Sequence, residues 1–408
     1  KFINNIITIK YICEKLKAII MAVDFNNTKI AFHLKSDSEL ERAYFLFKMI
    51  SIEPLVRIGT AATNFALRAH LPVEGLIRST VFDHFCGGVN EEDCVPTIDK
   101  MYASKVYSVL DYSVEGKGVE SQFDLALETI LNLIEFSKDK EALPIAVFKP
   151  SAFGSFDLYQ KVSENKTLTA SEINEWERLK VRFEKVCASG KLNNVKILID
   201  AEESWIQKAV DDLILELMQT FNTDALIVYS TLQTYRWDRL DYLKEIHIKA
   251  KQNNFKLGFK VVRGAYMEKE RQRAKELGYK SPICDTKEIT DALFNDTITY
   301  ILSNLDSIHL FIGTHNEESS QLALELMETS NISNNDPRVW FGQLYGMSDH
   351  ISFNLSEQGY NVAKYVPFGP VKDVMPYLIR RAEENTSIAG QTSRELSLIK
   401  KEKQRRNV

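Results

Sequence analysis

The chain repeats one local pattern, in which short apolar runs alternate with longer stretches of helical periodicity. The short runs are rich in Val, Ile, Leu and aromatic residues, as is typical of parallel strands buried on both faces. The longer stretches include Ser204–Phe221, where apolar residues recur at the spacing of a buried helix face. The candidate strands are Val106–Ser113, Ile145–Lys149, Val195–Asp200, Leu226–Ser230, Lys256–Arg263, His309–Gly313, Val339–Leu344 and Asn361–Pro367.

Strands that alternate with helices in this way predict an α/β protein, and eight of them favour a (βα)8 TIM-like barrel. A doubly wound sheet is the alternative, because the number of strands does not show whether the sheet closes. Within the helical stretches, Thr169 and Glu172 form a capping-box pattern, so we expect a helix to begin there and Gly190 to end it.

The ends of the chain differ from its middle. Residues 1–20 are rich in Lys, Ile and Asn and contain no Arg or Ser, so we expect an extension or leader, in helical form, rather than a transit peptide. Residues 21–100 carry helical periodicity and predict a helical N-terminal region packed on a barrel of residues 101–390. The last segment, 391–408, holds five basic residues after Glu395 and predicts an exposed, frayed tail.

Composition and motifs exclude several classes of protein. The net charge of −5 does not favour nucleic-acid binding. The five cysteines are scattered without a CxxC pair, which argues against a disulfide framework or a structural zinc site. The chain has neither HExxH nor a run of about 18 apolar residues, so neither a metalloprotease site nor a membrane span is expected.

Polar side chains gather where the candidate strands end. In a barrel, the carboxyl ends of all strands meet at one face, which is where chemistry is found. Each residue also has a structural alternative: Lys149 could be a surface lysine, and Asp200 could be a helix N-cap. Their number at one level favours a site. The residues at these positions are Asp111, Glu115, Lys149, Asp200, Gln233, Arg263–Tyr266, Thr314–Asn316 and Tyr365.

The segment from Pro376 to Ser387 predicts a helix with an unusual face. Pro376 suits the first helical position, and Tyr377, Arg380, Arg381 and Glu384 then share one face. Two neighbouring guanidinium groups are costly to bury unless an anion completes them, and a small carboxylate or a phosphate would do so. An exposed helix with internal salt bridges is the alternative.

The predicted site is rich in cations and poor in nucleophiles. The chain has no GxSxG, and no paired carboxylates flank an obvious bond. Lys149 and the two arginines converge on an anion, while Tyr365 and Tyr377 offer apolar walls with polar tips. Such a site binds a small amino or imino acid and leaves the redox chemistry to a cofactor. Neither GxGxxG nor GxxxxGK[ST] is present, so a nucleotide cofactor would lie across the barrel mouth.

The order and spacing of four motifs resemble those of the flavin-dependent proline dehydrogenases, in their monofunctional, eukaryotic-type branch. The resemblance runs from about Val106 to Asn385. It implies a distorted (βα)8 barrel that holds FAD and oxidises L-proline to Δ1-pyrroline-5-carboxylate, by hydride transfer from proline C5 to flavin N5. Electrons then pass to a membrane quinone. The motifs are Ile199–Glu202, Val262–Glu268, Thr314–Asn316 and Tyr377–Asn385.

The resemblance also implies roles for single residues. Lys149, Arg380 and Arg381 would clamp the proline carboxylate, with Lys149 and Asp200 in catalytic positions. Glu115 would pair with Arg380 as a gate. The remaining substrate-binding positions would be Asp111, Leu344, Tyr365 and Tyr377. Those that contact FAD would be Asp200, Gln233, Lys260, Val262, Gly264, Ala265, Tyr266, Lys287, Thr314, His315, Arg381 and Glu384.

One position departs from many members of the family. Lys260 stands where the bifunctional bacterial enzymes have an arginine beside the flavin, and a lysine lacks the forked contact of a guanidinium. Three other functions remain open at this stage: a hydroxyproline dehydrogenase, a catalytically silent carboxylate-binding barrel, and another flavin barrel such as methylenetetrahydrofolate reductase. Tyr365 argues against the first. The implied localisation is cytoplasmic, with peripheral contact at the inner membrane, on the matrix side in a mitochondrial protein.

Overall fold

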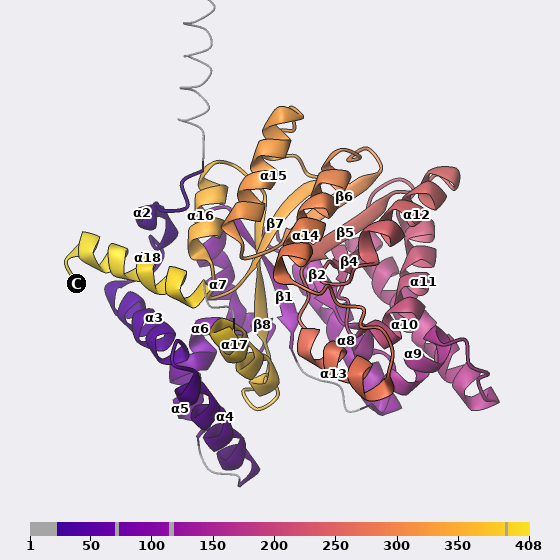
Figure 1. Cartoon of the computed structure of the whole chain (residues 1–408), viewed down its shortest axis with the longest axis horizontal. Helices are drawn as coiled ribbons and strands as arrows, with labels where there is room; N and C mark the ends of the chain where they lie inside the picture. The colour runs from indigo at the N-terminus through magenta and orange to yellow at the C-terminus, as the bar shows by residue number, and fades with distance from the viewer. Residues whose placement is uncertain (1–22, 70–72, 114–117, 388–390) are drawn as a thin grey trace, which may run out of the picture.

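The sheet is a closed parallel barrel, as the alternating pattern predicts. The computed structural model describes residues 23–69, 73–113, 118–387 and 391–408. Each strand pairs in parallel with its neighbour in sequence, and β8 pairs with β1 to close the ring, which excludes a doubly wound sheet (Figure 1). The strands are β1 (Val106–Tyr112), β2 (Ile145–Phe148), β3 (Lys196–Ile199), β4 (Val228–Gln233), β5 (Leu257–Val262), β6 (Ile308–Gly313), β7 (Val339–Leu344) and β8 (Val362–Phe368).

Helices precede the first strand and follow every strand. Before the barrel lie α2 (Thr28–Ala31), α3 (Asp37–Ile50), α4 (Glu53–Arg68), α5 (Glu74–Ile77), the π-helical turn Arg78–Phe82, α6 (Asp83–Phe85) and α7 (Glu91–Tyr102). Around and after it lie α8 (Glu120–Ser137), a 3₁₀ turn (Pro150–Ala152), α9 (Phe156–Ser163), α10 (Ala170–Asn193), α11 (Ser204–Phe221), α12 (Arg239–Gln252), α13 (Met267–Leu277), α14 (Lys287–Leu302), α15 (Glu317–Thr329), α16 (Asp349–Glu357), α17 (Met375–Ser387) and α18 (Gln391–Arg406).

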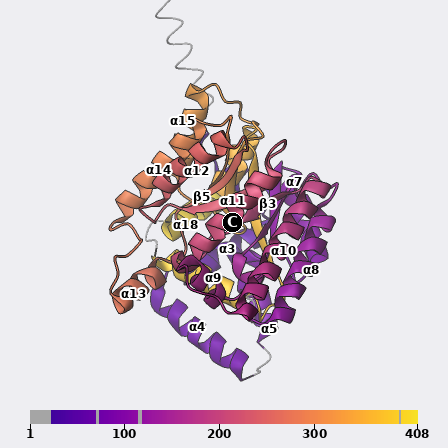
Figure 2. The same cartoon turned by 90° about the vertical axis from the view of Figure 1, so that its right-hand side faces the viewer.

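The core has two layers, because successive side chains of a strand point to opposite faces of the sheet. Inside the barrel, Val109, Tyr229, Phe311 and Tyr365 belong to one buried cluster. A larger cluster fills the space between the sheet and the surrounding helices, which Figure 2 shows from the side of α11. The barrel interior is therefore packed with side chains, and only its ends can hold a site.

Local details differ from three sequence predictions. Gln233 is the last residue of β4, which runs three residues further than expected, because the whole segment is buried between β3 and β5. The capping box of Thr169 and Glu172 is present, but α10 continues past Gly190 and ends before Asn194, a residue with φ of 54°. Helix α17 begins at Met375, one residue before Pro376.

The prediction of an exposed, frayed tail is wrong. Residues 391–406 form helix α18, which lies across α3 (Figure 1). Leu398 and Ile399 are buried with Phe32 and Phe47 in one cluster. The basic side chains of α18 are exposed or half-buried. The basic residues dominated the sequence signal, although the apolar residues among them line one helix face.

Two further sequence predictions lie partly or wholly outside the described residues. The leader predicted at residues 1–20 is outside them, and the boundaries of 21–100 and 101–390 stay a prediction. Among the helices that the structure describes, each is too short or too polar to cross a bilayer.

Candidate functional site

The polar residues predicted at strand ends lie at the carboxyl face of the barrel. Because all eight strands run parallel, their carboxyl ends share this face. Lys260 and Tyr365 lie deeper, inside strands β5 and β8. At the rim are Asp111 in β1, Lys149 after β2, Asp200 after β3, Gln233 in β4, Thr314 and His315 after β6, and Leu344 in β7.

Lys149 and Asp111 form an ion pair across the first two strands. The Nζ atom of Lys149 lies 3.3 Å from Oδ1 of Asp111, and Ser113 donates its hydroxyl proton to Oδ2 of the same carboxylate at 2.9 Å. Burial alone would lower the pKa of Lys149, but the charges of Asp111, Asp200 and Glu202 outweigh it and raise this pKa. Lys149 is therefore a fixed cation at the barrel mouth, not a surface lysine.

A second lysine, Lys260, is buried deeper in the barrel. Lys260 forms an ion pair with Asp200 and donates a hydrogen bond of 3.0 Å to the hydroxyl of Tyr365. Its Nζ atom also lies 4.7 Å from the centroid of the Tyr365 ring, a cation–π distance. Asp200 thus serves as the partner of a buried cation. It is not the N-cap of α11, a position that Glu203 occupies.

Leu344 joins two apolar clusters at the mouth. It packs against the interior cluster that contains Tyr365, and also against a cluster that contains Tyr377 and Leu378 of α17. Tyr365 and Tyr377 are both buried. The three residues predicted to wall the substrate therefore lie on one continuous apolar surface.

Helix α17 carries the two arginines at the edge of this surface. The guanidinium carbon of Arg381 lies 5.2 Å from the centroid of the Tyr377 ring, one turn earlier on the same face. The charge of Arg380 lowers the pKa of Lys149, against the stronger effect of the carboxylates. Arg381 acts likewise on His315, whose pKa falls to about 3, mainly through burial. Both arginines are thus within electrostatic reach of residues on the barrel rim.

Two predicted residues cannot be placed in this way. Glu115, the proposed gate, lies outside the described residues. Glu384 lies on α17, in a stretch where the structure describes the helix but not its side chains.

Most of the residues that were predicted to bind the cofactor lie at the carboxyl ends of β4, β5 and β6 or just after them. Arg263 donates to Oγ1 of Thr314 at 3.0 Å and pairs with Asp291, which also pairs with Lys287. Gly264 has φ of 131°, and a Cβ atom there would lie 2.6 Å from the Tyr235 ring, so only glycine fits. The neighbouring residues Ala265, exposed, and Val262 and Tyr266, half-buried, complete this side of the mouth.

The sequence placed Glu202 and Arg263 at strand ends but assigned neither of them a role in organising the site. Glu202 accepts hydrogen bonds from the backbone N–H and the hydroxyl of Ser151, at 2.8 and 2.7 Å, so it ties the loop after β3 to the loop that follows Lys149. The amide of Gln233 in turn donates to the backbone oxygen of Glu202 at 2.6 Å. Burial raises the pKa of Glu202 to about 7. Both residues stand inside the quoted motifs, which is the signal that could have found them.

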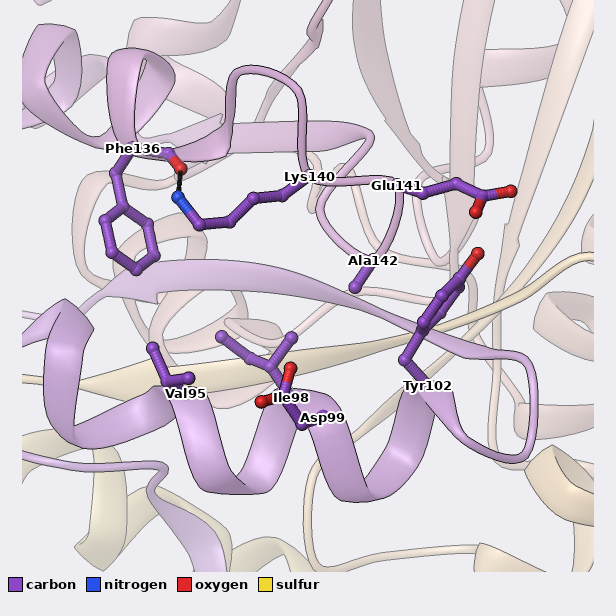
Figure 3. Close-up of a pocket in the computed structure, with 8 residues that line it drawn as sticks. All are labelled: Val95, Ile98, Asp99, Tyr102, Phe136, Lys140, Glu141 and Ala142. Carbon is purple, nitrogen blue, oxygen red and sulfur yellow. Dashed lines mark hydrogen bonds between the residues drawn. The ribbon is translucent and has the colours of Figure 1, made fainter.

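A surface pocket elsewhere is not part of this site. It lies between α7 and the connection from α8 to β2, lined by residues such as Ile98, Tyr102 and Ala142 (Figure 3). Lys140 spans one side and donates to the backbone oxygen of Phe136. Because this connection enters β2 at its amino end, the pocket lies at the opposite face of the barrel.

Comparison with known proteins decides the family. Residues 94–394 match the sequence pattern of the family Pro_dh, proline dehydrogenase. The chain belongs to the proline dehydrogenase family. This match covers the barrel and α17, including every rim residue described above, and it excludes a methylenetetrahydrofolate reductase.

Curated relatives of the proline dehydrogenase family align over most of the chain. The carbapenem antibiotics biosynthesis protein CarD of Pectobacterium carotovorum subsp. carotovorum is 40% identical over 335 residues, which is 82% of this chain and 87% of CarD. Proline dehydrogenase 1, mitochondrial, of Arabidopsis thaliana is 31% identical, over 94% of this chain and 86% of its own length. The Arabidopsis relative and the family match support proline dehydrogenase activity and a role in proline catabolism.

Solved structures show the same fold. Proline utilization A (PutA) from Bdellovibrio bacteriovorus, inactivated by N-propargylglycine, superimposes with a TM-score of 0.68 at 20% identity. The alignment covers 88% of this chain but only 38% of the PutA chain. At this identity the comparison shows a shared barrel fold, which agrees with the predicted (βα)8 architecture.

Proposed function

We propose that this proline dehydrogenase uses FAD to oxidise L-proline to Δ1-pyrroline-5-carboxylate, the first step of proline catabolism, and passes the electrons to a membrane quinone. The observation that carries the proposal is the pairing of a fixed cation with an apolar wall at one barrel face. Lys149 supplies the cation, and Tyr365, Leu344 and Tyr377 supply the wall. This combination suits a small, compact molecule that carries a carboxylate.

The substrate carboxylate would bind between Lys149, Arg380 and Arg381. Guanidinium groups hold a carboxylate with two parallel hydrogen bonds, which fixes its orientation as well as its position. The pyrrolidine ring would then lie on the surface formed by Leu344 and the two tyrosines. Most of the rate acceleration in such a site comes from this positioning.

The substrate amine must lose its proton before it can be oxidised. Neighbouring positive charges lower the pKa of an ammonium group, and this mouth contains two lysines besides the arginines of α17. Asp200 would stand near the amine, as a carboxylate already held by Lys260. The arginines of α17 would therefore favour the neutral, reactive amine, whereas the Asp200 carboxylate would oppose them.

The residues after β4 to β6 fit FAD. The glycine at 264 leaves open backbone at the mouth, and the exposed Lys287 is a cation suited to phosphate groups. Gln233, Thr314, His315, Lys260 and the backbone of Val262 and Ala265 would supply further contacts, as would Arg381 and Glu384. When bound, FAD would accept the hydride from proline C5 at its N5 atom.

Contact with a membrane surface would bring the site to its quinone. Helices α3 and α4 project from the barrel (Figure 1). Several large apolar side chains on them face solvent. Phe45 and Ile58 are 65% and 66% exposed, and Met49, Ile52 and Leu55 extend the same surface. Exposed Lys48 and Arg57 lie among these residues, which suits anionic lipid. Helix α4 also contacts α17, so this surface borders the substrate site.

Oxidation of hydroxyproline is the second candidate, and the buried ring of Tyr365 disfavours it because an added hydroxyl would need space there. The test is to purify the protein, extract and identify its cofactor, and measure initial rates with a soluble quinone analogue. L-Proline and trans-4-hydroxyproline are compared at equal concentrations. Release of FAD together with a preference for proline supports the proposal. A preference for hydroxyproline overturns the substrate assignment, and a protein that takes up no flavin is a silent barrel.

A further inference from the structure

The connection from β7 to α16 is held by residues from distant parts of the chain. Lys364 of β8 donates to the backbone oxygen of Met347 at 2.7 Å and pairs with Asp349 at 2.7 Å. His84 of α6 donates to the backbone oxygen of Gly346 at 3.0 Å. Because this connection starts at Leu344, its position bears directly on the substrate and cofactor site.

Ser348, at the end of this connection, has a strained backbone. Its φ and ψ are 52° and 40°, in the left-handed region that residues with a side chain rarely adopt. The residue is completely buried. Such a conformation costs free energy and persists only where its surroundings hold it, which often occurs at functional sites.

Glu395 of α18 is one of the groups that hold Ser348. The backbone N–H of Ser348 donates to Oε1 of Glu395 at 2.6 Å, although the two residues are 47 positions apart. Glu395 is 2% exposed, so its carboxylate points inward from α18. The Nδ1 atom of His350 also lies near this carboxylate, at 3.9 Å from Oε1.

The side chain of Ser348 acts on His315. The Nδ1 atom of His315 lies 2.9 Å from Oγ of Ser348. Burial, with Lys364 and Arg381 nearby, lowers the pKa of His315 to about 3, so the ring is neutral at pH 7 and carries one proton. The Ser348 hydroxyl can donate to Nδ1 or accept from it, so the orientation in which Ser348 is held determines whether that proton lies on Nδ1 or on Nε2.

We propose that Glu395 is a positioning residue for the cofactor site: by holding the backbone of Ser348, it fixes the ring orientation and tautomer of His315. The role of His315 toward FAD rests on the proposed function, but the three-residue chain from Glu395 to His315 does not. Helix α18 thereby becomes part of the active-site framework. The sequence alone gave it no such role.

The first test measures FAD binding to apoprotein by fluorescence titration. E395A removes the acceptor for Ser348, and S348A removes the hydroxyl that contacts His315. Each should raise the dissociation constant about tenfold, the scale of one lost buried hydrogen bond. E395Q keeps an acceptor oxygen and should stay within about threefold of the wild type. If E395A fails to fold, S348A and E395Q together carry the test.

Glu402 provides the matched control. It is also buried on α18, but it pairs with Arg405 and Arg406 and does not reach the β7–α16 connection. E402A should therefore leave the FAD dissociation constant unchanged, even if it lowers the melting temperature. Equal effects of E402A and E395A on FAD affinity would show that Glu395 only stabilises the helix, and would overturn the proposal.

A double-mutant cycle and a spectrum complete the test. If Glu395 acts through Ser348, the E395A/S348A protein should bind FAD no more weakly than S348A alone, whereas additive losses would contradict the proposal. In ¹⁵N-histidine NMR spectra of apoprotein, assigned with H315N, E395A should change the His315 tautomer signals. Unchanged signals would refute the relay. This readout needs no cofactor, so a protein that fails to bind FAD would refute the proposed function separately.

Discussion

The Nζ atom of Lys260 lies 3.0 Å from the hydroxyl of Tyr365, on the inner surface of the barrel. The same ammonium pairs with Asp200 and lies over the Tyr365 ring. Lys260 is 6% exposed, so its charge is satisfied by a carboxylate, a hydroxyl and a π face. Lys260, at the position where many family members have arginine, thus forms one bonded unit with Asp200 and Tyr365 at the base of the site.

This unit predicts coupled stability effects. K260M should destabilise the folded protein by about 3 kcal/mol, because it leaves the partly buried Asp200 carboxylate without its partner. D200N should also destabilise it, since it removes the partner of a buried ammonium. In the K260M/D200N protein the loss should be smaller than the sum of the two. Urea unfolding of all four proteins measures the coupling, and additive losses would show that the pair is not a unit.

The carboxylate clamp predicts a selective effect on KM. R381M should raise the KM for proline about ten- to a hundredfold, the value of a charge-assisted hydrogen bond. It should do so more than K260A, because Lys260 faces Asp200 and Tyr365 rather than the proposed carboxylate position. R381K, which keeps the charge but loses the fork, should fall between R381M and the wild type. Equal KM values for R381M and K260A would argue against the clamp.

Glu202 predicts a pH-dependent stability difference. Burial, opposed by the Ser151 hydrogen bonds, raises its pKa from 4.5 to about 7 in the folded state. Between these values the folded protein holds a proton that the unfolded chain has lost, so this carboxyl stabilises the fold less as pH rises. Because glutamine does not titrate, E202Q should not show this loss of stability with rising pH.

Urea unfolding of the wild type and E202Q at pH 4.5, 6 and 8 measures this difference. Relative to the wild type, E202Q should gain up to about 3 kcal/mol between pH 4.5 and 8. E203Q serves as the control, since Glu203 neighbours Glu202 but makes no hydrogen bond to Ser151. A stability difference between E202Q and the wild type that stays constant with pH would contradict the raised pKa.

The exposed surface of α3 and α4 predicts binding to anionic vesicles. Wild-type protein should sediment with vesicles that contain phosphatidylglycerol, and less with phosphatidylcholine alone. F45D/I58D should lose this binding while its rate with a soluble acceptor stays unchanged. L192D is the control, because Leu192 is 85% exposed on α10, away from this surface. Dimers of wild-type protein that F45D/I58D converts to monomers would instead assign the surface to a second copy.

The fold could be predicted from the sequence because the strands are short apolar runs and the helices carry a clear helical period. Strand bounds agree within a few residues, and Ser204–Phe221 forms α11 at the predicted bounds. The end of the chain was misjudged because its basic residues suggested solvent exposure. The burial of Glu395 and Ile399 depends on contacts with distant elements, which no local pattern reports.

The site could be predicted in part, because it follows from the arrangement of the strands. Parallel strands bring their carboxyl ends together, so Asp111, Lys149 and Asp200 could be grouped in advance. Their partners could not, because side-chain pairing depends on three-dimensional register: Lys260 with Tyr365 spans 105 positions, and Ser348 with Glu395 spans 47. The predicted roles of the individual residues toward proline and FAD remain to be tested.

The most direct test of the central claim is the visible absorbance spectrum of FAD-loaded protein, recorded without oxygen before and after addition of L-proline. The account predicts an oxidised flavin band that bleaches with proline, more slowly or not at all with hydroxyproline, and at much higher proline concentrations in R381M. A protein that binds FAD but keeps its spectrum unchanged in saturating proline would contradict the account.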